Sequence, residues 1–322
     1  MVMRKIPICR FLSLLLALTL LPMFLKRCVS ENEITTKRYD SVKTTTPSEG
    51  QRKQNPGAKF DPSSFDCSVR LADPDTFPLV PLISPPGAGN TWLRHLIEQA
   101  TGFYTGSVYR DVDLYKGGLL AEFEDFMEGN TLTVKAHNAI RLARICKAAI
   151  LLLRNPIDIA IAERNRRNQS DHIGLATWNE DLRADEAWRE FVQAQFDQYG
   201  YLVNGFLNLQ VPTLVVHYEN IRDNTVGEVK RIVKFLNMTM NKERKLCVEN
   251  NSEGNFHRHN NDTKTPYKMF TNKMKCHALA LMTKVSRLLT DHGHEPLPCI
   301  QDNLISDCNS IAKILSPVKP CE

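Results

Sequence analysis

The sequence has no pair of cysteines at the C-x-x-C spacing of a zinc site, and it has no internal repeat. A thiolate zinc site and a repeat architecture are therefore not expected. The net charge is only +5 at pH 7, which fits a protein that handles phosphates but does not by itself indicate nucleic-acid binding. We expect no metal and no nucleic-acid partner. The 322 residues are enough for one large domain, or at most two.

The longest apolar run lies near the N-terminus, where residues 11–25 are apolar apart from Ser13 and Thr19. Counting from Ile6, the run reaches about 20 residues, within the roughly 17–25 of a membrane-spanning helix. A cleaved signal peptide and an uncleaved signal-anchor are the two interpretations. No small-x-small cleavage site follows the run, and Lys26-Arg27 stands in its place, which favours the anchor. Basic residues on both sides orient the segment only weakly.

Composition divides the rest of the chain into a flexible part and a folded part. The segment after the apolar run is rich in Thr, Lys, Ser and Pro, with few large apolar side chains, so it is predicted to be a flexible stem. The predicted division is a cytosolic tail at 1–5, a transmembrane helix at 6–27, a luminal stem at 28–72, a folded domain at 73–298 and a cysteine-containing tail at 299–322.

Cysteines and glycosylation sequons indicate a luminal location for the folded part. Apart from Cys9 in the apolar run, eight of the nine cysteines follow it, and this even number is typical of disulfides in an oxidising compartment. Their connectivity stays open. N-glycosylation sequons begin at Asn168, Asn237, Asn250 and Asn261.

Apolar runs alternate with helical patterns from residue 77 onward. This alternation predicts an α/β fold, a single three-layer domain of the P-loop-like kind with a mainly parallel sheet. Ligands of such sheets bind beyond the carboxyl ends of the strands. The predicted strands are 77–84, 132–137, 148–153 and 213–218, and the predicted helices are 91–100, a helix after Pro156, 185–207 and 224–236.

A glycine-rich turn follows the first predicted strand, in the segment S-P-P-G-A-G-N-T-W from Ser84 to Trp92. Gly87 and Gly89 permit backbone conformations that aim N–H groups inward, and the helix that follows offers free donors to an anion. The Gly-Lys-Ser/Thr ending of a Walker A loop is absent. We interpret the turn as a phosphate cradle; an ordinary turn between strand and helix is the alternative.

Three further motifs fall at strand ends. Lys135 and His137 lie on one face of the second strand and could serve as cation and general base, although a structural histidine is the alternative. Arg154 leaves an apolar strand and suits a phosphate, unless it pairs with Asp158 or Glu163. Tyr218 either packs near a base or caps the core.

The order of these motifs resembles that of nucleotide-dependent sulfotransferases: strand–PGAGNTW–helix, K-x-H, strand–RNP and a strand ending in Tyr-Glu. The stretches from Gly89 to Arg94, Gln99 to Tyr109, His172 to Ala176 and Val215 to Glu219 are most similar to the WSCD family. The resemblance covers about residues 77 to 290. We do not expect the WSC domains that give the family its name, because the segment before residue 77 is too short and too poor in cysteine to hold them.

This resemblance implies 3′-phosphoadenosine 5′-phosphosulfate (PAPS) as the donor and a hydroxyl or amine as the acceptor. The expected location is the Golgi membrane, in which the protein would be a single-pass type II protein. Secretion after signal cleavage is the alternative. The implied acceptor is a glycan or glycoconjugate, and the WSCD branch suggests sialylated glycans. Whether the protein forms a homodimer is left open. The implied roles are the 5′-phosphosulfate at Gly87, Ala88, Gly89, Asn90, Thr91 and Trp92, the acceptor proton at His137, charge balance at Lys135, the 3′-phosphate at Arg154 and Arg258, and adenine at Tyr218.

The sequence departs from the family pattern at three positions. Many relatives have a basic residue and a serine where this chain has Gly87 and Ala88, and a serine where it has Ala162. Arg94, Arg164 or Arg166 are the candidates to compensate. The departures leave a non-catalytic binding protein of the same fold as the second hypothesis, and a luminal nucleotide kinase, which would need a P-loop lysine, as the third.

Overall fold

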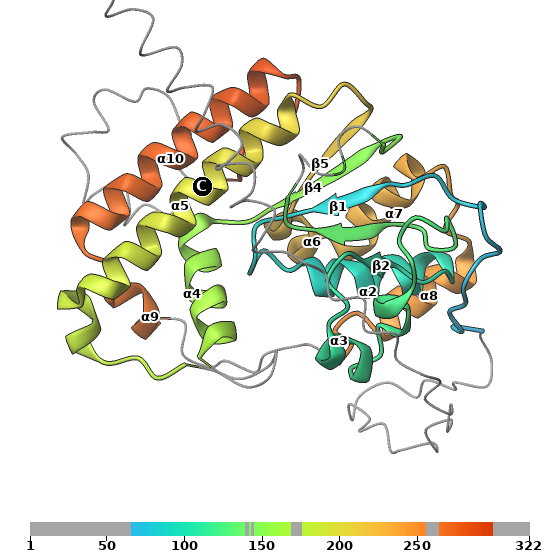
Figure 1. Cartoon of the computed structure of the whole chain (residues 1–322), viewed down its shortest axis with the longest axis horizontal. Helices are drawn as coiled ribbons and strands as arrows, with labels where there is room; N and C mark the ends of the chain where they lie inside the picture. The colour runs from blue at the N-terminus through green and yellow to red at the C-terminus, as the bar shows by residue number, and fades with distance from the viewer. Residues whose placement is uncertain (1–65, 139–141, 143–144, 169–175, 256–263, 299–322) are drawn as a thin grey trace, which may run out of the picture. The chain divides into compact units, whose positions relative to one another are not determined.

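A parallel sheet organises the computed structural model, which describes residues 66–138, 142, 145–168, 176–255 and 264–298. The strands stand in the order β2-β3-β1-β4-β5, and every neighbouring pair is parallel (Figure 1). Their bounds are Pro81–Ile83 for β1, Gly106–Ser107 for β2, Val134–Ala136 for β3, Ala149–Leu153 for β4 and Thr213–His217 for β5.

The central strands β1 and β4 are buried along their whole length, as expected for strands covered on both faces. The predicted mainly parallel α/β fold is therefore confirmed. Each predicted strand contains an observed one, although the observed strands are shorter. Tyr218 is a correction, because it begins a helix rather than ending the strand. Strand β2 was not predicted, since two residues with one glycine leave no hydrophobic pattern.

Helices gather on both sides of the strands. In Figure 1, α5 and α10 run side by side on one side, and α2, α7 and α8 lie on the other. Trp188 of α5 is buried with its ring in edge-on contact with Phe270, and its indole N–H donates to the carbonyl of Met269 at 3.1 Å. The bounds are Asn90–Thr101 for α2, Val112–Lys116 for α3, Pro156–Arg167 for α4, Glu186–Leu207 for α5, Tyr218–Asp223 for α6, Thr225–Phe235 for α7, Lys242–Asn250 for α8, Lys264–Lys268 for α9, Asn272–Asp291 for α10, and Leu120–Phe123 and Glu180–Ala184 for the 3₁₀ helices η2 and η3.

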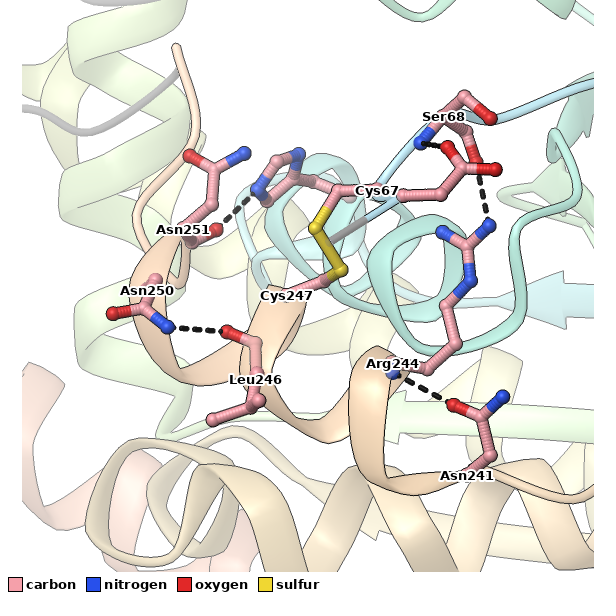
Figure 2. Close-up of a disulfide and its surroundings, with 10 residues drawn as sticks. Cys67, Ser68, Asn241, Arg244, Leu246, Cys247, Asn250 and Asn251 are labelled. Atoms are coloured by element: carbon pink, nitrogen blue, oxygen red, sulfur yellow. Dashed lines mark hydrogen bonds between the residues drawn. A yellow bond between two sulfur atoms is a disulfide. The ribbon is translucent and has the colours of Figure 1, made fainter. Parts of the chain in front are cut away.

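A disulfide between Cys67 and Cys247 joins the start of the described chain to α8 (Figure 2). Next to it, the Arg244 guanidinium donates to the carbonyl of Ser68 at 2.7 Å. The Arg70 amide donates to the Gly102 carbonyl at 3.0 Å. Residues 67–72, which the composition predicts to be part of the stem, therefore pack on the domain.

Three of the four sequons lie within the residues that the structure describes, whereas the predicted membrane segment does not. Asn168, Asn237 and Asn250 are all exposed, whereas Asn261 lies outside the described residues. Within the described ranges, none of the helices combines the length and the apolar character that crossing a bilayer requires. The predicted helix at 6–27 lies outside those ranges.

A fully buried ion pair fixes the position of α2 relative to its neighbours. Arg94 binds Glu122 of η2 at 2.6 Å, with both side chains 0% exposed. The guanidinium also donates to the hydroxyl and the carbonyl of Thr105, each at 2.8 Å. Thr105 in turn donates to Glu98, whose burial raises the pKa of its carboxyl to about 7. The Arg94 side chain therefore lies in the core, where it is bound to Glu122 and Thr105.

The Glu122→Gln substitution should destabilise the full-length chain by about 3–5 kcal/mol, because it leaves the buried Arg94 charge without its partner. The matched control is Glu186→Gln, which breaks an exposed pair with Arg189 and should cost at most about 1 kcal/mol. Thermal and urea unfolding of both variants measure the difference. Equal shifts in the two variants would contradict a stabilising role for the buried pair.

Candidate active site

A cleft of about 750 Å³ opens at the carboxyl ends of the strands. Its floor is the turn between β1 and α2, where Gly89 is the N-cap of α2 and no described side chain caps the helix. The first amides of a helix have no partner within it, and the helix dipole adds partial positive charge. The turn therefore presents Asn90, Thr91 and Trp92 as a site for an anion.

The two glycines of the turn are required by close packing. Gly87 has φ of +89°, and a Cβ there would lie 2.8 Å from the Ile159 carbonyl of α4. Gly89 has φ of +96°, and a Cβ there would lie 2.7 Å from the ring of Tyr218. Both values exclude a side chain without movement of its neighbours. The turn is thus wedged between α4 and Tyr218.

Side chains of the turn secure it from both ends. Asn90 donates to the Leu82 carbonyl and the Ser84 hydroxyl, each at 3.1 Å, which ties the start of α2 to β1. The Trp92 indole N–H donates to the carbonyl of Ser252 at 2.8 Å. Ala88 differs from the prediction: it is fully buried, and its amide donates to the Pro85 carbonyl at 3.2 Å. Ala88 therefore does not face the cleft.

His137 follows β3 and lines the cleft. Its Nδ1 lies 2.7 Å from the carbonyl of Ser84, and because a carbonyl only accepts, Nδ1 carries the proton and Nε2 is the basic nitrogen. Burial, together with the positive charge of Lys135, lowers the pKa of His137 to about 4. The imidazole is neutral at pH 7 and has the tautomer that a general base needs.

Lys135 lines the same cleft from the middle of β3. Burial, together with the charge of Arg94, lowers its pKa to about 8, so the ammonium remains mostly charged at pH 7. Its Nζ lies 5.6 Å from the ring centroid of Tyr109, and the Tyr109 hydroxyl accepts from the His137 amide at 2.7 Å. The predicted base and cation are therefore brought together.

Arg154 leaves the end of β4 and lies over the ring of Tyr218, with 4.2 Å between the guanidinium carbon and the ring centroid. It also donates to the Gly87 carbonyl at 3.3 Å. Its contact with Asp158 is long, at 4.0 Å, and the Asp158 carboxylate accepts from the Tyr267 hydroxyl at 2.6 Å. The ion pair with Asp158, which was the alternative to a phosphate role, is thus present but weak, and Arg154 lines the cleft.

Part of the cleft wall was missed by the sequence analysis. Tyr109 ends a stretch that is similar to the WSCD family, but this similarity indicates no role for it, and Tyr267 is 109 positions from the Asp158 that it contacts. Further lining residues without a signal are Asp111, Ile161, Asn165, Arg222, Thr225, Ser252 and Glu253. Arg258 lies outside the described residues, so its predicted role stays a prediction.

Only Arg166 of the three compensating arginines named above faces the cleft. Arg94 is buried against Glu122. Arg164 lies over the rings of Trp178 and Trp188. The cleft thus combines uncapped helix amides, a neutral imidazole and several cations, which suits transfer of an anionic group to a nucleophile that must lose a proton.

A family model described as the sulfotransferase domain matches residues 78–278 of this chain. The chain belongs to this family. Relatives include WSCD family members from Aedes aegypti, 34% identical over 183 residues, and Drosophila melanogaster, 35% identical over 183 residues. Each match covers 56% of this chain and 57% of the relative, so the chain matches little more than half the length of these proteins.

Solved structures with a similar arrangement include a mouse sulfotransferase in complex with PAP, at 18% sequence identity and a TM-score of 0.45. That match covers 68% of this chain and 89% of the mouse chain. A retinol dehydratase in complex with androsterone and PAP has 14% identity and a TM-score of 0.41, with 64% and 80% covered.

The Gly89→Ala substitution should weaken anion binding at the turn, because the new Cβ collides with Tyr218. The matched control is Gly293→Ala, which has φ of +76° but no atom within 4 Å of a Cβ. Both variants carry the backbone strain of roughly 1–2 kcal/mol, and thermal unfolding should show it in both.

Titration with adenosine 3′,5′-bisphosphate (PAP), the desulfated form of the implied donor, separates the two variants. Gly89→Ala should lose on the order of tenfold in affinity, about 1.4 kcal/mol, whereas Gly293→Ala should bind as the unaltered chain does. Equal affinities would contradict the turn as the phosphate site.

Proposed function

We propose that this protein is a sulfotransferase that moves the sulfuryl group of PAPS to a hydroxyl of a glycan or glycoconjugate in the Golgi lumen. The observation that carries the proposal is the placement of His137, with Nδ1 fixed on Ser84, in the same cleft as the uncapped N-terminus of α2. Membership of the sulfotransferase family supports the reaction class.

The donor is assigned to the glycine-rich turn and to Arg154. Amides of Asn90, Thr91 and Trp92 would hold the 5′-phosphosulfate, since they have no capping side chain. Arg154 would bind the 3′-phosphate, because its planar fork suits a phosphate and its contact with Asp158 is long. Tyr218, beside Arg154 and Gly89, would contact adenine. No step of this scheme uses a metal.

Transfer forms a bond between sulfur and the acceptor oxygen and breaks the bond between sulfur and the phosphate oxygen, which leaves with the electron pair. The acceptor proton passes to Nε2 of His137, the nitrogen that Ser84 leaves basic. Lys135, whose side chain faces the same cleft, balances negative charge as it develops. These roles account for a partly buried histidine and a buried lysine on one strand end.

The location in the secretory pathway rests on three features. The apolar segment at 6–27 predicts a signal-anchor, and secretion after cleavage is the alternative. The disulfide between Cys67 and Cys247 is typical of an oxidising compartment. The sequons at Asn168, Asn237 and Asn250 are exposed, as glycosylation requires.

A non-catalytic binding protein of the same fold is the second candidate. The observation that favours it is the lack of a basic side chain anywhere from Ser84 to Leu93. The buried Lys135 and the oriented His137 favour catalysis instead, because nucleotide binding alone requires no base.

The His137→Ala substitution should abolish sulfate transfer and leave nucleotide binding intact, because the histidine acts on the acceptor proton. Loss of a general base typically costs about 10²–10⁴-fold in rate. The assay follows radiolabelled sulfate from PAPS to a mixture of glycans, with PAP affinity measured by calorimetry on the full-length protein. His292→Ala, an exposed histidine at the end of α10, serves as the control and should leave both values unchanged.

Three results would contradict parts of this proposal. Normal transfer by His137→Ala would remove the base assignment. Absence of PAP binding by the unaltered chain would overturn the function itself. PAP binding without transfer across a broad acceptor panel would favour the non-catalytic protein.

A further inference from the structure

Sulfuryl transfer concentrates negative charge on the sulfuryl oxygens and the leaving phosphate oxygen, and a fixed cation close to them lowers the barrier. The glycine-rich turn supplies no cation, because the segment from Ser84 to Leu93 has no basic residue. Arg94, the next residue, is buried against Glu122. Lys135 of β3 is one cation of the cleft, and a cation beside the turn itself has to come from another element. This inference rests on the proposed function.

Helix α4 is that element, because the turn packs directly on it. A Cβ at Gly87 would lie 3.2 Å from the Glu163 amide and 3.3 Å from the Cβ of Ala162. Tight contact and a φ of +89° leave no room for a side chain on the turn. The space beside the phosphate cradle is accessible instead to side chains of α4 that follow Ala162.

Arg166 is placed to fill this space. It stands four residues after Ala162, so the two side chains share one face of the helix, and both line the cleft. Side chains of a helix lean toward its N-terminus, which for Arg166 is the direction of Ala162 and Glu163, the residues of α4 that the turn contacts. The observed contacts agree, since the Arg166 guanidinium reaches back to Glu163.

Glu163 holds Arg166 in a fixed orientation. Nε and Nη2 of Arg166 each donate to one Glu163 oxygen at 2.7 Å, and the carboxylate also accepts from Nε of Arg167 at 2.7 Å. Burial opposes ionisation of Glu163, but the hydrogen bonds from both arginines outweigh it and lower its pKa. One carboxylate and two guanidiniums keep a net positive charge, and Nη1 of Arg166 is not used by Glu163.

The charge of Arg166 already acts on the proposed transfer machinery. Burial is the main reason for the lowered pKa of Lys135 and of His137, and Arg166 contributes to both shifts in the same direction. The side chain of Arg166 is 44% exposed, whereas that of Glu163 is fully buried. Arg166 thus combines access to a ligand with a buried anchor.

Arg222 is another exposed arginine of the cleft and serves as a comparison. It comes from α6, and its Nε donates to Asp223 at 2.8 Å. It is not among the groups that act most strongly on the pKa of Lys135 or His137. Its position favours the nucleotide side of the cleft near Tyr218 rather than the site of transfer.

We propose that Arg166 supplies the positive charge that stabilises the sulfuryl group during transfer, and that Glu163 is its positioning residue. The sulfur–phosphate oxygen bond breaks, the sulfur–acceptor oxygen bond forms, and the acceptor proton goes to His137. Arg166 exchanges no proton or electron in this step. Its Nη1 donates to oxygens whose negative charge increases during transfer.

The test compares Arg166→Gln with Arg167→Gln in the full-length protein. Both changes remove one charge and one partner of Glu163, but Arg167 does not line the cleft. Arg166→Gln should lower sulfate transfer from radiolabelled PAPS to a glycan mixture, and to water, by about 10²-fold, the typical cost of removing one donor to a developing charge. Arg167→Gln should stay within about threefold, since the charge that it removes is exposed and outside the cleft, and Arg166 still pairs with Glu163. PAP affinity should be unchanged in both, because PAP lacks the sulfuryl group.

Two further readouts separate a charge role from a structural role. Arg166→Lys should recover part of the transfer rate, because it restores the charge without the fork. Lys135, Glu163 and Arg166 are the charged groups that act most strongly on His137. Removing the positive Arg166 should raise the pKa of His137, so the acid limb of the kcat/KM profile should move to higher pH in Arg166→Gln.

Several outcomes would overturn the assignment of Arg166. One is a sulfate-transfer rate for Arg166→Gln that equals the rate for Arg167→Gln. Another is a PAP affinity of Arg166→Gln that falls by as large a factor as its transfer rate. If the unaltered protein binds PAP but transfers sulfate to neither glycans nor water, the assignment fails together with catalysis. If the unaltered protein does not bind PAP, the proposed function itself fails. If the unaltered protein binds PAP and transfers sulfate, and Arg166→Gln transfers sulfate at the same rate, only the assignment of Arg166 fails.

Discussion

The close packing of one turn between two neighbours is the constraint on which the site depends. Gly87 lies against α4 and Gly89 lies against Tyr218, and neither position has room for a Cβ. This packing leaves the backbone amides at the start of α2 as the donors that the turn presents. It also brings Tyr218, and with it Arg154, next to the anion site. Buried contacts of Arg94 with Glu122 and Thr105 hold α2 in the orientation that this requires.

The same constraint explains why the functional groups of the cleft come from several different elements. The turn has no basic side chain, so under the proposed function it would bind an anion through its backbone, and the groups that carry charge or move protons would come from strand ends and from α4. β3 supplies His137, whose tautomer is set by the carbonyl of Ser84, and Lys135 beside it. α4 supplies Arg166, anchored by a buried carboxylate. The chemistry is thus distributed over elements that the sheet already holds together.

The sequence predicted those parts of the structure that local patterns encode. The apolar run from Ala149 to Leu153 marked a buried parallel strand, and the glycine-rich turn marked the start of α2. Contacts between distant segments left no such pattern. The direction of Arg166 compared with Arg94 depends on packing, and Tyr267 meets Asp158 only in the folded chain. The burial of Ala88 likewise follows from its neighbours.

A crystal structure of the protein with bound PAP tests the central claim most directly. The account predicts the 5′-phosphate within hydrogen-bonding distance of the amides of Asn90, Thr91 and Trp92, and the 3′-phosphate on the guanidinium of Arg154. Nη1 of Arg166 should face the place beyond the 5′-phosphate where a sulfuryl group would stand. A nucleotide held elsewhere in the cleft, without contact to the start of α2, would contradict it.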